Sequence, residues 1–149
     1  MWSSEHSRFL SGRIVLLAIL LGLAAYPAQA GEVLLVTART STIETLSRNE
    51  AEQLYLGRRA TLASRISLLV DLPPGKTRDD FYRKLTSKNP SQIRAHWSRM
   101  VFTGRALPPK EASDVDDARR LLIENPNAIA YLPRHYASDP DLRVLLHLE

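Results

Sequence analysis

Apolar positions in residues 31–149 alternate between short strand-like runs and segments with helical spacing. Val33 to Thr37 and Ile66 to Val70 are apolar runs typical of buried strands. Ala128 to Leu132 and Leu142 to Leu148 predict two more strands near the end of the chain. Because helical patterns separate these runs, the sequence indicates an α/β fold.

Capping signals locate the first two predicted helices. Ser47, with Glu50 three residues later, predicts a capping box and a helix that runs from about Arg48 and stops at Gly57. The segment Asp71 to Lys76 contains two prolines and is predicted to be a loop. Thr77 is predicted to cap a helix that starts at Arg78 and buries the pair Phe81 and Leu85.

Two further helices follow, separated by a predicted loop from Arg105 to Ser113. Asn89-Pro90, with Gln92 at the third helical position, predicts the start of one helix, which ends near Gly104. Its predicted core stripe is Ile93, Trp97, Met100 and Val101. The last helix presents Val115, Ala118, Leu121 and Leu122 and ends at Asn125-Pro126-Asn127.

The first thirty residues have the three parts of a secretory signal peptide. Arg8 and Arg13 precede an apolar run from Ile14 to Ala25, which is shorter than the about 20 residues that a membrane span needs. Ala28-Gln29-Ala30 suits signal peptidase, so we expect cleavage after Ala30 and a periplasmic or secreted product. The alternative is an uncleaved N-terminal anchor. The chain has no cysteine for lipid attachment or disulfides.

Cleavage would leave one domain, residues 31–149, with a small positive charge. Residues 1–30 contain two arginines and one glutamate, so the net charge changes from +4 to +3 on their removal. The charges are mixed along the chain, and no basic stripe with interleaved aromatic residues is present. Nucleic acid is therefore not expected as a partner.

Catalytic and metal-binding patterns are absent from the sequence. The spacing of His96, His135 and His147 matches no metal-ligand motif, and no Gly-x-Ser-x-Gly elbow occurs. Asp79-Asp80 and the acidic cluster from Asp114 to Asp117 lie at predicted helix starts, where carboxylates complement the helix dipole. We therefore expect no enzyme activity, no cofactor and no metal.

The junction between the second strand and its helix is the candidate ligand site. Gly75, Lys76, Thr77 and Arg78 pass from a strand end into a helix N-terminus, where free amides and the helix dipole favour anions. These four residues are the predicted ligand-binding residues. The alternative is that Thr77 only caps the helix and Lys76 is a solvated turn residue.

Several stretches in a fixed order resemble the phosphate-type substrate-binding proteins of ABC uptake systems. They are Leu46-Ser47-Arg48 with Leu54 to Arg59, Asp71 to Tyr82, Trp97-Ser98 with Phe102-Thr103-Gly104, and Asn125 to Tyr131. The resemblance implies one lobe of a type II periplasmic-binding-protein-like fold, with a mixed open sheet flanked by helices and closed by its final strand. It also implies recognition of phosphate or a similar oxyanion.

The chain departs from this family in two ways. Family members have two lobes and are roughly twice as long, whereas this chain has one. Their anion loop reads Arg-Asp-x-Gly-Ser-Gly-Thr-Arg, and here Asp71 stands at the arginine position while Thr77 and Arg78 match. Because a carboxylate repels phosphate, only Thr77 carries over cleanly as a ligand-binding candidate.

Two hypotheses of function follow, and the sequence leaves both open. One is a lobe that binds phosphate or another oxyanion for an ABC-type uptake system. The other is a non-enzymatic interaction or sensory module that has lost ligand binding and contacts a membrane transporter or envelope protein. Its candidate surfaces are Gly57-Arg58-Arg59 and the loop Thr103 to Lys110. A homodimer that rebuilds a two-lobed cleft is a third arrangement, which no particular residue predicts.

Overall fold

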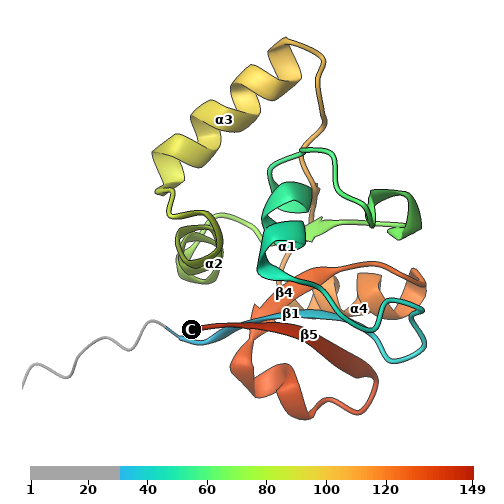
Figure 1. Cartoon of the computed structure of the whole chain (residues 1–149). Helices are drawn as coiled ribbons and strands as arrows, with labels where there is room; N and C mark the ends of the chain where they lie inside the picture. Colours follow the sequence, from blue (N-terminus) through green and yellow to red (C-terminus); the bar gives the residue numbers. More distant parts are fainter. Residues whose placement is uncertain (1–30) are drawn as a thin grey trace, which may run out of the picture.

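The first strand of the protein lies between its last two strands (Figure 1). The computed structural model describes residues 31–149, so the predicted signal peptide and its cleavage after Ala30 lie outside the described residues. Strand β1 (Val33–Ala38) pairs antiparallel with β4 (Ala130–Pro133) on one side and β5 (Leu142–Leu148) on the other. Every residue of β1 is buried, as expected of a strand covered on both faces.

A second, parallel pair of strands extends this arrangement. Strand β2 (Val70–Asp71) pairs with β3 (Lys110–Glu111), and Leu69 forms a parallel bridge with Ile129 just before β4. Parallel and antiparallel pairings therefore occur together. The expected mixed α/β architecture is confirmed, and β5 closes the sheet as predicted.

Most helix starts lie where the capping signals predicted them. Ser47 and Glu50 form a reciprocal capping box on α1, and Asn89 and Gln92 do so on α3. Asp114 caps α4 by accepting a hydrogen bond from the Asp117 amide. The helices are α1 (Arg48–Tyr55), α2 (Lys76–Thr86), α3 (Pro90–Phe102) and α4 (Val115–Glu124), with short 3₁₀ turns at Ala63–Arg65 and Arg134–Ser138.

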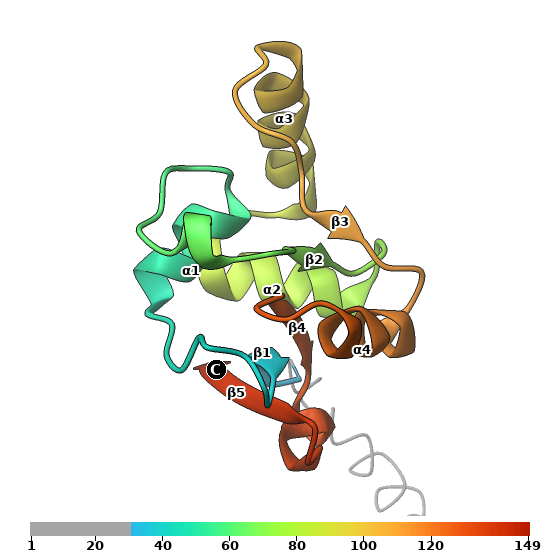
Figure 2. The same ribbon diagram turned by 90° about the vertical axis from the view of Figure 1, so that its right-hand side faces the viewer.

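Helix α3 projects away from the sheet, and the chain returns from its far end to β3 (Figure 2). Ile93 and Trp97 are buried as predicted, whereas Met100 is only partly buried and Val101 is 48% exposed. The predicted core stripe is therefore wrong for its last turn, because that part of the helix has no neighbour to cover it. No helix in residues 31–149 is long and apolar enough for a membrane span.

Strand boundaries differ from the prediction more than helix boundaries do. The second strand is Val70–Asp71 and not Ile66–Val70, because regular pairing with a neighbouring strand begins only at Val70, and Leu69 before it forms only an isolated bridge. The strand expected at Ala128 to Leu132 is Ala130–Pro133. Strand β3 lies inside the segment that was predicted to be a loop.

The start of α2 is also corrected. Gly75, and not Thr77, is the N-cap residue, and the helix begins at Lys76. The amide of Asp79 donates to the Gly75 carbonyl at 3.0 Å, which closes the first turn two residues earlier than predicted. Phe81 and Leu85 are buried, as the helical spacing predicted.

Candidate functional site

Asp71 lies at the end of β2, and its carboxylate turns into the protein. The residue is only 2% exposed. One oxygen, Oδ2, accepts from the Tyr82 hydroxyl at 3.0 Å, and the other, Oδ1, accepts from the Tyr131 hydroxyl and from the Leu72 amide at 2.9 Å. The carboxylate is therefore held by donors from α2, from β4 and from the residue that follows β2.

Aromatic rings hold these donors in place. Phe81 stacks on Tyr131 with ring centroids 3.7 Å apart and contacts Tyr55 edge-on at 4.7 Å. The hydroxyl of Tyr55 donates to the Val70 carbonyl at 2.9 Å, which ties α1 to β2. Because all of these rings are buried, the position of the Asp71 side chain depends on core packing.

Burial sets the protonation of the groups around Asp71. It raises the pKa of Tyr82 and of Tyr131, so both hydroxyls keep their protons and act as donors. Burial also raises the pKa of Asp71 above its ordinary value of 3.8, and the hydrogen bond from Tyr131 and the charge of Arg78 only partly offset this. The carboxyl is therefore harder to ionise in the folded protein than in the unfolded chain.

The raised pKa of Asp71 predicts that the stability of the protein depends on pH. A raised pKa stabilises the folded state fully below the unfolded pKa, and that contribution is lost as the pH rises through the folded pKa. Asparagine does not titrate. The stability advantage of the wild type over Asp71→Asn is therefore expected to shrink as the pH rises above about 4, as measured by urea unfolding of both proteins at matched pH. An advantage that grows over this range would contradict the prediction.

The basic residues of the predicted anion loop pair with carboxylates of the same chain. Arg78 lies 3.1 Å from Asp71 and 3.0 Å from Glu111, and it stands over the ring of Tyr82. Lys76 pairs with Asp80 at 2.5 Å, one helical turn along α2. Both cations thus have internal partners that sequence reasoning did not identify.

The four predicted residues are neighbours at the start of α2 but differ in their surroundings. Gly75 and Lys76 are exposed, whereas Thr77 and Arg78 are half-buried. Only Arg78 lines a pocket, a hollow of about 180 Å³ between α2 and α3. Arg94, from the first turns of α3, lines the same pocket, as do Pro74, Asp79, Tyr82, Pro90 and Ile93. The pocket therefore brings two arginines to an otherwise mainly apolar surface beside the loop.

Sequence reasoning missed the residues that complete this region. Tyr82 follows Arg78 by one helical turn, so their shared face was a signal that was available. Glu111, Arg94 and Tyr131 come from distant segments, and nothing in their local sequence points to Arg78 or Asp71. Within residues 31–149 no group of three possible metal ligands is found.

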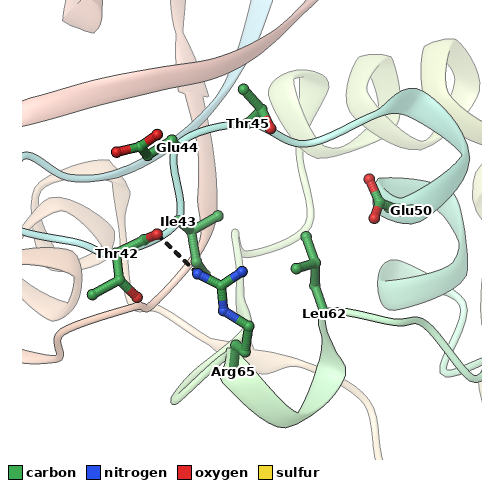
Figure 3. Close-up of a pocket in the computed structure, with 7 residues that line it drawn as sticks. All are labelled: Thr42, Ile43, Glu44, Thr45, Glu50, Leu62 and Arg65. Carbon is green, nitrogen blue, oxygen red and sulfur yellow. Dashed lines mark hydrogen bonds between the residues drawn. The ribbon is translucent and has the colours of Figure 1, made fainter.

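A larger pocket lies elsewhere, beside the loop that follows β1 (Figure 3). It has a volume of about 270 Å³, and its lining residues are Thr42, Ile43, Glu44, Thr45, Glu50, Leu62 and Arg65. Arg65 donates to the Thr42 carbonyl at 2.9 Å, and Glu50 is held in the capping box of α1. The pocket shares no residue with the predicted site, and its Arg65 and Glu50 side chains already have partners.

Comparison with known proteins supports the fold. No family model matches the sequence, and neither does any curated protein. Two solved structures resemble the chain with a TM-score of 0.57. One is described as a phosphate ABC transporter substrate-binding protein with bound phosphate from Clostridium perfringens, at 16% identity. The other is an ABC-type phosphate transport receptor from Vibrio cholerae, at 12% identity.

The extent of the match shows how much of these structures the chain represents. It covers 78% of this chain but only 45% and 46% of the two solved chains, so this chain spans less than half of their length. The protein therefore has the fold of a single lobe of the periplasmic-binding-protein type, as the sequence resemblance implied.

Proposed function

We propose that the protein is an exported single-lobe binding protein that takes phosphate or another small oxyanion for an ABC-type uptake system. The observation that carries this proposal is the convergence of Arg78 and Arg94 on one pocket beside the N-terminus of α2. The similarity of the fold to a phosphate-bound structure supports it. In this proposal Gly75, Lys76 and Thr77 supply backbone amides and a hydroxyl next to the pocket.

The proposal makes a prediction for anion binding. Calorimetric titration of the exported protein with phosphate, sulfate and small organic anions at low salt is expected to show saturable binding at or below about 1 mM, equivalent to about 4 kcal/mol. Arg94→Gln and Thr77→Ala are each expected to weaken binding by about tenfold, because each removes a donor to the anion.

The matched control for this titration is Arg59→Gln, which removes an exposed arginine that lines neither of the two pockets. Its affinity is expected to equal that of the wild type. If a folded wild-type protein gives no heat with any anion, the oxyanion function is rejected. Equal weakening by all three variants would show that net charge alone, and no particular site, attracts the anion.

A second function is favoured by a specific observation. The carboxylates of Asp71, Glu111 and Asp80 already pair with Arg78 and Lys76. This internal neutralisation supports a non-enzymatic interaction or sensory module that contacts a membrane transporter or envelope protein. The same titration tests it, because this function requires a folded protein without anion binding.

A further inference from the structure

The net positive charge of residues 31–149 comes from one projecting segment. We call residues 87–110 the α3 arm; they comprise α3, the turn before it and the loop that returns from it. Of the 18 basic residues in residues 31–149, five lie in the arm, and all 15 acidic residues lie outside it. These five are Lys88, Arg94, Arg99, Arg105 and Lys110. The arm is therefore strongly cationic, whereas the rest of residues 31–149 is slightly acidic.

The cations of the arm are not neutralised by carboxylates within the described part of the chain. Among the ion pairs of residues 31–149, none includes a residue of the arm. Arg99 and Arg105 are exposed and flank the end of α3. By contrast, the arginines of α4 pair with carboxylates nearby. The arm thus presents charges that are free to meet an anionic surface.

Exposed apolar side chains lie beside these charges. Phe102, at the far end of α3, is 92% exposed, and Val101 before it is 48% exposed. Leu107, on the returning loop, is 82% exposed. Three of the four large hydrophobic residues that are exposed in residues 31–149 therefore belong to the arm. The fourth, Ile123, is on α4.

We propose that the end of the α3 arm binds the surface of an anionic phospholipid bilayer. Phe102 and Val101 enter the boundary between headgroups and acyl chains, and Arg99 and Arg105 contact the phosphate groups around them. Apolar side chains surrounded by unpaired cations are the pattern by which peripheral proteins bind such membranes. Membrane binding of this kind rests on the proposed export, which would place the protein beside an envelope membrane. It does not depend on oxyanion binding.

The shape of the arm favours a bilayer over an acidic protein. The end of α3 projects from the body of the protein (Figure 1). Neither of the two pockets described above includes a residue from this end of the helix. A projecting point suits insertion into a flat, deformable surface. A specific protein interface instead needs a matched patch of roughly 800 Å² on each partner.

Vesicle sedimentation tests this proposal. The exported protein is mixed with phosphatidylcholine vesicles, with or without phosphatidylglycerol. We expect binding only to the anionic vesicles, and it should weaken as salt is added. Phe102→Ser is expected to reduce partitioning by at least about tenfold. Arg99→Gln and Arg105→Gln are each expected to reduce it by about fivefold.

Two matched variants complete the test. Ile123→Ser removes an exposed apolar side chain outside the arm and is expected to leave partitioning unchanged. Phe102→Trp should preserve binding, and its fluorescence should shift to the blue on addition of anionic vesicles. Equal sedimentation of wild type and Phe102→Ser would overturn the proposal. So would a lack of vesicle binding together with Phe102-dependent capture of an envelope protein.

Discussion

Replacing Asp71 with alanine is expected to lower the free energy of unfolding by about 3–5 kcal/mol. The substitution removes the acceptor for two buried hydroxyls, those of Tyr82 and Tyr131, and for the Leu72 amide. It also leaves Arg78 with Glu111 as its remaining charged partner. Each buried donor without an acceptor costs about 1–3 kcal/mol, although the Leu72 amide can still approach the Tyr131 hydroxyl at 3.1 Å.

Urea unfolding, monitored by circular dichroism, measures this loss. The control is Glu44→Ala, because Glu44 is an exposed carboxylate whose removal should change stability by less than about 0.5 kcal/mol. A loss below about 1 kcal/mol for Asp71→Ala would contradict the prediction. It would mean that water or neighbouring groups replace the carboxylate.

Replacing Gly57 with alanine is expected to destabilise the protein by about 2–5 kcal/mol. Gly57 ends α1 with a positive φ of 64°, a conformation that costs a residue with a Cβ about 1–2 kcal/mol. A Cβ there would also lie 2.8 Å from the Cβ of Ala106 and 2.9 Å from the Trp97 ring. Ala106 and Trp97 belong to the α3 arm, so the clash would push the arm away from α1.

Gly104 provides the matched control for this substitution. Its φ of 65° is nearly the same, but a Cβ at this position would meet no atom within 4 Å. Gly104→Ala is therefore expected to cost only about 1–2 kcal/mol. The difference between the two variants in urea unfolding isolates the close contact at Gly57. Equal losses would show that backbone conformation alone determines both effects.

Features that depend on a few neighbouring residues were predicted well from the sequence. The capping box at Ser47 and the helix start at Asn89 formed as predicted, because the residues of each signal lie within one helical turn. The pair Phe81 and Leu85 was buried for the same reason. The resemblance to substrate-binding proteins also gave the correct fold, because it used the order of several separate stretches.

Features that depend on distant segments were not predictable in this way. Lys110 and Glu111 become a strand only because β2 lies beside them, and their own sequence carries no strand signal. Asp71 accepts a hydrogen bond from Tyr131, which lies sixty residues further along the sequence. Val101 has the spacing of a core residue, but it is exposed because the end of α3 extends beyond the body. At the candidate site, sequence alone therefore predicted the loop but not its internal ion pairs.

The central place of β1 in the sheet has a consequence for the order of folding. The strand is among the first parts of residues 31–149 to be made, yet both of its partners, β4 and β5, are among the last. Pairings between the two ends of a chain form slowly, since a long loop must close before any contact offsets its entropy. The sheet is therefore expected to assemble only after β5 has been synthesised. Under the proposed export, this delay would keep the chain unfolded for passage through a translocation channel.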